Sequence, residues 1–148
     1  MPGTNFEWRM RILAVAVVVV YWGAMFAGTH IKFSGPPMPH APGDKTMHFV
    51  AYAGLAFLWL VAAASFGRVT WFMYLVTMVG AAAYGAVDEV SQSLVGRDMD
   101  IADWRFDMMG AAIGSIGFAA VYAAWNVWQR PKDASADSQA RSTSEGKP

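Results

Sequence analysis

Four long, almost unbroken apolar stretches constrain this chain more than any other feature of its sequence. They cover about residues 12–28, 47–66, 69–87 and 108–128. A bilayer core is about 30 Å thick, so a helix that rises about 1.5 Å per residue needs about 20 apolar residues to cross it. A helix also satisfies its own backbone hydrogen bonds, as the hydrocarbon requires. The sequence therefore predicts an all-α fold, a membrane bundle of four transmembrane helices.

Composition agrees with a membrane protein and excludes several other classes. Hydrophobic residues make up 55% of the 148 residues. Charged residues make up only 15%, against about 25% in soluble domains. The formal net charge is zero and the basic residues are scattered, so nucleic acid is not an expected partner. The absence of cysteine excludes disulfides and thiolate chemistry. The sequence predicts no metal site and identifies no cofactor.

The chain divides into a membrane domain and a tail. Residues 1–129 hold the four stretches, whereas residues 130–148 are rich in Ser, Ala, Asp and Lys and predict a disordered tail. The first stretch also has the basic flank of a signal peptide, but its apolar run is long and the residues 25–28 make a poor cleavage site. We expect it to remain as a membrane span. The short turn at Gly67-Arg68 predicts that the second and third helices form an antiparallel hairpin.

Four spans place both termini on the same side of the membrane, and the basic residues near span ends indicate which side. Arg9, Arg11, Arg68, Arg130 and Lys132 would be cytoplasmic, against Lys32, Lys45, Arg97 and Arg105 outside. This small excess predicts cytoplasmic termini. The loop 29–43 and the segment 88–107 would then face the outside, so that both groups of polar residues lie near one membrane surface.

The first polar group lies at the start of the second helix. Asp44 follows Gly43 and stands where an N-cap residue is expected. Asp44, His48 and Tyr52 recur every four residues, so they line one helix face, with Lys45 beside them. Each residue taken alone also fits a simpler interpretation, in which Asp44 caps the helix, Lys45 reaches lipid headgroups and His48 is interfacial.

The second polar group lies where the third apolar stretch ends. The helix is expected to continue through Asp88 and Glu89 to about Val95, with Gly96 as its C-terminal cap. Helical spacing places Ala81, Gly85, Asp88 and Gln92 on one stripe. An acidic side chain costs about 2.5–3.5 kcal/mol at the bilayer centre and less near the surface, so these carboxylates need partners. The expected partners are Lys45, His48 and Arg97.

The fourth helix presents a third set of residues on a single face. Asp103, Asp107, Gly110, Gly114 and Gly117 recur at spacings of four, three, four and three residues. Gly85, Gly110 and Gly114 are expected to let neighbouring helix backbones approach closely. The acidic residues allow two interpretations: they are hydrated at the membrane surface, or they form a functional site. Because so many ionisable residues fall near one surface, the functional interpretation is favoured.

Together these residues resemble the VanZ-like family of bacterial integral membrane proteins. The resemblance is carried by Asp44-Lys45-x-x-His48-Phe49-x-x-Tyr52, Asp88-Glu89-x-x-Gln92, Gly96-Arg97, Asp103, Asp107 and Gly110. It implies a four-helix protein of the bacterial cytoplasmic membrane, and the founding member of the family is linked to teicoplanin resistance. The family's polar positions carry over to Asp44, Lys45, His48, Asp88, Glu89, Gln92, Arg97, Asp103 and Asp107. This chain has Val95 where many relatives have Pro, and relatives often have Asn at the position of Asp107.

These residues allow several functions. In the favoured one, Lys45, Arg97 and His48 hold an anionic envelope lipid or cell-wall precursor, which would affect glycopeptide susceptibility. In an alternative, carboxylates hold a divalent cation against a lipid-linked phosphate and His48 is the acid or base of an enzyme. No nucleophile motif or phosphate loop supports catalysis, so enzymatic activity stays open. A structural role is the third alternative. An ion pathway is disfavoured because the interior of each span is uncharged.

Overall fold

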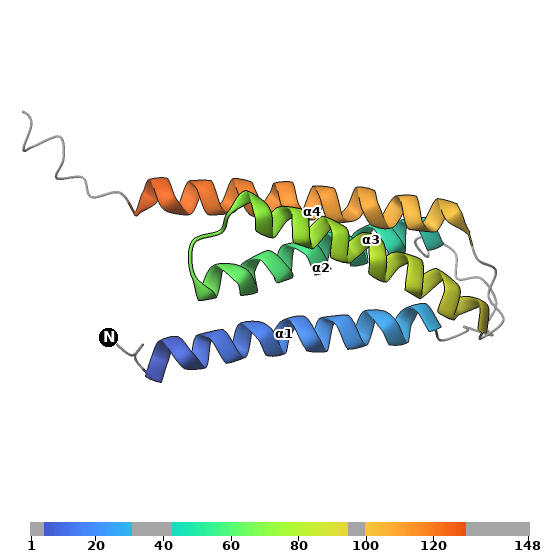
Figure 1. The fold of residues 1–148 in the computed structure, drawn as a ribbon, viewed down its shortest axis with the longest axis horizontal. Helices are drawn as coiled ribbons and strands as arrows, with labels where there is room; N and C mark the ends of the chain where they lie inside the picture. The colour runs from blue at the N-terminus through green and yellow to red at the C-terminus, as the bar shows by residue number, and fades with distance from the viewer. Residues whose placement is uncertain (1–4, 31–42, 95–99, 130–148) are drawn as a thin grey trace, which may run out of the picture. The chain divides into compact units, whose positions relative to one another are not determined.

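The computed structural model describes residues 5–30, 43–94 and 100–129, except for the side chain of Asp44. The described residues form four helices, shown in Figure 1: α1 (Asn5–His30), α2 (Asp44–Phe66), α3 (Trp71–Leu94) and α4 (Ile101–Trp128). Each of these helices is long and apolar enough to cross a membrane. The predicted all-α fold of four membrane-spanning helices is therefore confirmed. The predicted disorder of residues 130–148 lies outside the described residues.

The helices extend beyond the apolar stretches. α1 begins at Asn5 rather than near Ile12, and α4 begins at Ile101 rather than near Met108. α3 continues to Leu94, as its polar continuation predicted, whereas the predicted cap at Gly96 lies outside the described residues. Hydropathy marks the bilayer core, but a helix can continue into the interface wherever its side chains are hydrated or paired. At the start of α2 the N-cap residue is Gly43, one residue before the predicted Asp44.

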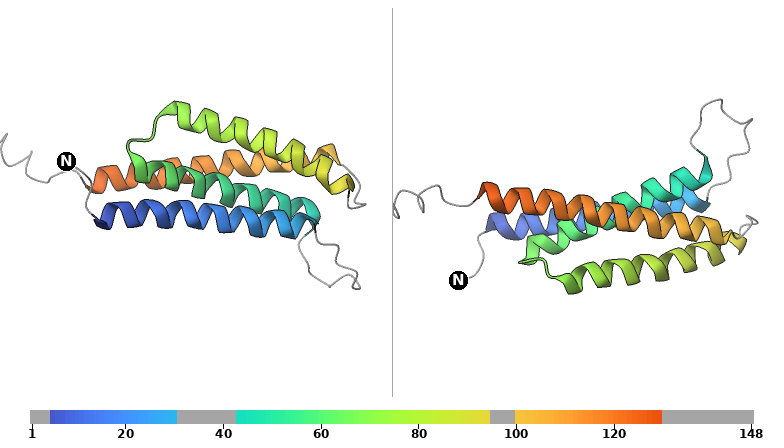
Figure 2. Two further views of the ribbon diagram at one scale, coloured as in Figure 1. Left: turned by 60° about the horizontal axis from the view of Figure 1, so that its bottom comes forward. Right: turned by 90° about the horizontal axis from the view of Figure 1, so that it is seen from above.

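The first three helices alternate in direction. Gly67 ends α2 with φ at 157°, a backbone conformation that favours glycine, and residues 67–70 lead into α3. Near the other end of this hairpin, the rings of Tyr52 and Tyr84 lie 5.9 Å apart. α1 runs antiparallel to α2, because Arg11 Nε donates to the carbonyl of Ser65 and Tyr21 donates to that of Ala51. Figure 2 shows the same arrangement from two further sides.

The first part of α4 lies directly against the backbone of α2. A Cβ atom at Gly110 would collide with the carbonyl oxygen of Phe49, and one at Gly114 would collide with that of Ala53. Two buried glycines one turn apart therefore allow the two backbones to touch. Gly117, on the same predicted stripe, is instead exposed, and a Cβ there would meet only Phe57 at 4.0 Å.

The chain divides into two compact units, residues 1–118 and 119–148, and α4 contributes to both. The polar residues and the pocket described below belong to the first unit. In the second unit, the rings of Trp125 and Trp128 lie 5.3 Å apart near the C-terminal end of α4. Aromatic rings at the end of a span are typical of the membrane interface.

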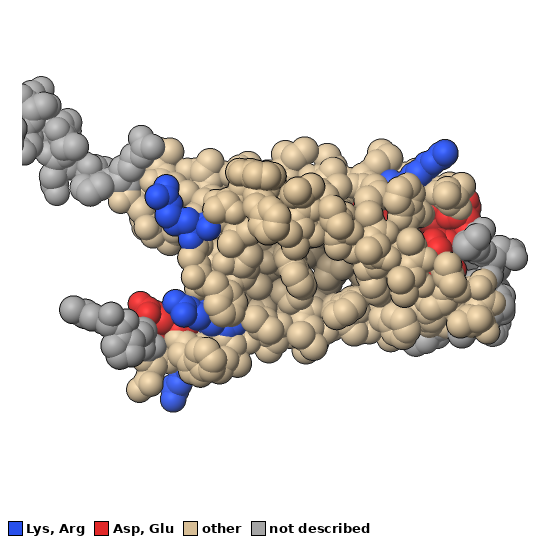
Figure 3. Space-filling model, viewed as in Figure 1, with Lys and Arg blue, Asp and Glu red and all other residues tan. Residues whose placement is uncertain are grey.

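The surface of the first unit has the polarity expected of a membrane protein. On the face drawn in Figure 3, charged side chains gather near two ends, and the surface between them is uncharged. Large apolar side chains point outward along the helices, among them Val20 at 71% exposed and Ile116 at 63%. An apolar surface of this extent is unfavourable in water, and it matches a hydrocarbon environment.

Candidate functional site

The polar residues meet at one end of the bundle because neighbouring helices alternate in direction. The C-terminal ends of α1 and α3 meet there with the N-terminal ends of α2 and α4. Hydrogen bonds join these ends, from Thr29 to Asp88 at 3.1 Å and from the backbone N–H of Asp100 to Glu89 at 3.0 Å. We call this group the polar site, which comprises Lys45, His48, Asp88, Glu89, Gln92, Asp100, Asp103 and Asp107.

A buried histidine–carboxylate pair lies in the polar site. His48 of α2 is 3% exposed and Asp107 of α4 is fully buried, with Nδ1 and Oδ1 2.9 Å apart. Gly85 of α3 makes room for the pair, since a Cβ there would lie 3.0 Å from Asp107 Oδ2. This explains why a glycine occupies the stripe of α3 next to the carboxylates. Among the described residues, Asp107 Oδ2 and the buried hydroxyl of Tyr52 have no hydrogen-bond partner.

Lys45 links the start of α2 to the start of α4. Its ammonium group donates to Asp100 Oδ2 at 2.7 Å and to Asp103 Oδ1 at 3.1 Å. The other oxygen of Asp100 accepts the backbone N–H of Ala102 at 2.8 Å and so caps the first turn of α4. Lys45 and this N–H hold the pKa of Asp100 below its usual range. The side chain of Lys45 is 45% exposed, so this pair lies at the edge of the polar site.

Asp88 is fully buried and receives hydrogen bonds on both oxygens. Thr29 donates to Oδ1 from the end of α1, and Gln92 donates to Oδ2 at 2.9 Å from the next turn of α3. His30 Nδ1 lies 3.9 Å from Oδ1, and its Nε2 lies 2.9 Å from the hydroxyl of Ser91. Neutral donors thus solvate most of this carboxylate, which lowers the cost of burying it.

The carboxylate of Glu89 accepts fewer hydrogen bonds than that of Asp88. Its Oε2 accepts the backbone N–H of Asp100, whereas its buried Oε1 accepts no hydrogen bond from the described residues. One imidazole nitrogen or carboxylate oxygen from each of His48, Glu89 and Asp103 lies within 4.8 Å of those of the other two. The interior of the polar site therefore brings together one imidazole and several carboxylates from three helices. Such a group can hold a cation or share a proton.

The structure brings most of the predicted site residues together, but it pairs them differently from the prediction. Lys45 and His48 were expected to pair with Asp88 and Glu89 of α3, whereas both contact the acidic residues at the start of α4. Gln92 is buried beside Asp88. The side chain of Asp44 and all of Arg97 lie outside the described residues.

Three contributors were not recognised as site residues from the sequence. Thr29 and His30 reach Asp88 and Ser91 from the end of α1. Asp100 joins Lys45 to Glu89. Their position in the sequence could have identified them, because the end of the first span and the start of the fourth are predicted to lie at the same membrane surface.

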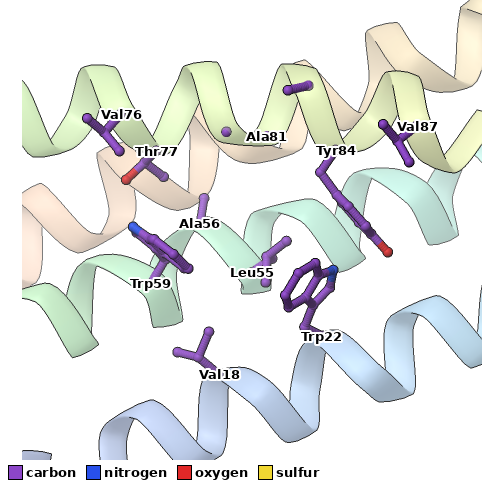
Figure 4. A pocket seen from close by; sticks show the side chains of 12 residues that line it. Val18, Trp22, Leu55, Ala56, Trp59, Val76, Thr77, Ala81, Tyr84 and Val87 are labelled. Carbon is purple, nitrogen blue, oxygen red and sulfur yellow. The ribbon is translucent and has the colours of Figure 1, made fainter.

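An apolar pocket lies between α1, α2 and α3 (Figure 4). It is lined by Val18, Trp22, Leu55, Ala56, Trp59, Val76, Thr77, Gly80, Ala81, Ala83, Tyr84 and Val87. The hydroxyl of Thr77 donates to the carbonyl of Met73, so it is already satisfied within its own helix. The pocket continues along α3 to Val87, the residue before Asp88.

Comparison with known proteins identifies the family of the chain. No curated protein and no solved structure matches it. The family model described as VanZ/LLP1 matches residues 5–123, a range that contains every residue of the polar site. The resemblance inferred from the polar motifs is confirmed by this match. The chain is a membrane protein that belongs to the VanZ/LLP1 family.

Proposed function

We propose that the polar site binds the anionic headgroup of an envelope lipid or lipid-linked cell-wall precursor, while the apolar pocket holds an acyl chain of the same molecule. The observation that carries this proposal is the continuity of the two sites along α3. Tyr84 lines the pocket, and Asp88 of the polar site lies one helical turn further along the same face of α3. An amphipathic molecule oriented like a membrane lipid matches this order of apolar and polar surface.

The chemistry of the pocket supports an acyl chain as its occupant. Its lining includes the aliphatic side chains of Val18, Leu55 and Val76 and the rings of Trp22 and Trp59, all within membrane-spanning helices. The hydroxyl of Thr77 is bonded to its own backbone, so the other polar side-chain groups of the lining are the hydroxyl of Tyr84 and the ring N–H groups of Trp22 and Trp59. Water in the pocket would find few hydrogen-bond partners, whereas a hydrocarbon chain would lose none.

The polar end supports an anionic headgroup through Lys45 and two helix termini. A lysine ammonium group has three N–H donors, and two of them contact Asp100 and Asp103. The third is available to a phosphate or carboxylate at the partly exposed edge of the site. The N-termini of α2 and α4 lie at the same end, and their dipoles and backbone N–H groups favour negative charge there.

Replacing Lys45 with alanine is expected to reduce the anionic lipid that remains bound to the purified protein at least fivefold. Native mass spectrometry of the full chain released from its own membranes measures this amount. Arg105→Ala is the control, because it removes one positive charge from an exposed residue of α4 that is not part of the polar site. Equal lipid loss in both variants, or no loss in either, contradicts the proposal.

Through such a lipid the protein would alter teicoplanin susceptibility. Cells with Lys45→Ala are expected to lose that effect, whereas cells with Arg105→Ala keep it.

We also propose that the protein lies in the bacterial cytoplasmic membrane with both termini in the cytoplasm, which places the polar site at the outer surface. The chain lacks cysteine, so single introduced cysteines report topology without background. A membrane-impermeant maleimide is expected to label Ser34→Cys in intact cells and Ser138→Cys only after lysis. The reverse pattern of labelling would show that the polar site faces the cytoplasm.

A further inference from the structure

We propose that His48, Glu89 and Asp103 together hold a divalent transition-metal ion inside the polar site. Each residue comes from a different helix, α2, α3 or α4, and contributes one ligand atom to a group within 4.8 Å. All three residues are buried, at 3%, 4% and 4% exposed. In a tetrahedral site with bonds of about 2.0–2.2 Å, the ligand atoms lie about 3.3–3.6 Å from one another. A contraction of the group by about 1 Å would thus complete the site.

Glu89 supplies an independent indication of a ligand. Its Oε2 already accepts the backbone N–H of Asp100, and its Oε1 is buried without a hydrogen-bond donor among the described residues. Asp103, the second carboxylate of the group, accepts Lys45 on Oδ1. Two buried carboxylates this close repel each other unless a cation or a proton lies between them. A metal ion would satisfy Glu89 Oε1 and remove that repulsion.

His48 is oriented as metal-binding histidines usually are. Such histidines bind the ion through one ring nitrogen and hydrogen-bond to a carboxylate or carbonyl through the other. The Nδ1 atom of His48 lies 2.9 Å from Asp107 Oδ1, and both residues are buried. Gly85 keeps the space beside Asp107 open. In this arrangement Asp107 is a positioning residue, and the Nε2 atom of His48 is the expected ligand.

The ligand set selects the class of ion. One imidazole and two carboxylates suit Zn²⁺ or Mn²⁺, whereas Ca²⁺ and Mg²⁺ prefer oxygen ligands alone. Three protein ligands leave at least one coordination position open to water or to an exogenous oxygen. The open position provides a further role, which rests on the proposed function: a headgroup phosphate oxygen would bind the ion. The ion would offset the carboxylates that otherwise repel such a headgroup.

The site can be tested in the absence of lipid. The full-length protein is stripped with a chelator in a zwitterionic detergent and titrated with MnCl₂ or ZnCl₂, using electron paramagnetic resonance for Mn²⁺ and calorimetry for Zn²⁺. We expect one ion per chain and at least tenfold weaker binding for Glu89→Gln. The same substitution at the exposed Glu7, on the first turn of α1, is expected to leave binding within twofold of the wild type.

The wild-type titration decides the inference even if Glu89→Gln fails to fold. Binding of neither ion to the folded wild type overturns it, as does equal weakening by Glu7→Gln. Retention of anionic lipid is then measured with and without the ion. If the protein retains the lipid but binds no metal, the metal site is contradicted and the proposed function is still supported. Metal bound with no effect on lipid retention supports the site and overturns its role in bridging a headgroup.

Discussion

Replacing Gly114 with alanine is expected to destabilise the folded protein by about 1–3 kcal/mol, the usual cost of overpacking a well-packed contact. The added methyl group would collide with the carbonyl oxygen of Ala53, which belongs to the backbone of α2 and cannot rotate away. α4 would have to move off α2, and the contacts of the neighbouring turns would weaken with it. Unfolding of the purified protein by a denaturing detergent, followed by circular dichroism, measures the change.

Gly117→Ala is the matched control for this prediction. It makes the same chemical change nearly one turn further along α4, at an exposed position where a new Cβ would meet only Phe57 at 4.0 Å. Alanine is preferred to glycine in a helix by up to about 1 kcal/mol, so this variant is expected to be neutral or slightly stabilised. If both variants lose the same stability, the close approach of α4 to α2 is wrong.

Replacing Asp107 with alanine is expected to destabilise the protein by about 3 kcal/mol, because it leaves the buried Nδ1 of His48 without its acceptor. Asp107→Asn keeps an oxygen at the same place, so its loss is expected to stay below about 1.5 kcal/mol. The same detergent unfolding measurement compares the two variants. Equal losses would mean that the volume of the side chain, rather than its hydrogen bond to His48, stabilises this part of the bundle.

The elements of the fold that could be predicted from the sequence are those with a strong local signal. Apolar stretches identify spans because the bilayer demands a minimum length of hydrocarbon surface. The stripe of Ala81, Gly85, Asp88 and Gln92 followed from helical spacing, and all four residues are buried in the structure. Gly117 shows the limit of that argument, because it continues the stripe of α4 but is exposed. Spacing identifies a face of a helix, and a neighbouring helix covers only part of it.

The partners of the polar residues could not be predicted in the same way. Lys45 contacts α4 instead of the α3 carboxylates, since that choice depends on how helices far apart in the chain lie side by side. The same is true of Thr29, which reaches Asp88 from α1. The apolar pocket is likewise a space between three helices, and no single segment encodes it.

The most direct test of the proposed function compares two lipids that differ only in their headgroup. The purified wild-type protein is offered equal amounts of phosphatidylglycerol and phosphatidylcholine with identical acyl chains, and native mass spectrometry counts the lipids that stay bound. We expect one phosphatidylglycerol per chain, in at least fivefold excess over phosphatidylcholine. Equal retention of the two lipids, or retention of neither, would contradict a site for an anionic headgroup at the end of this bundle.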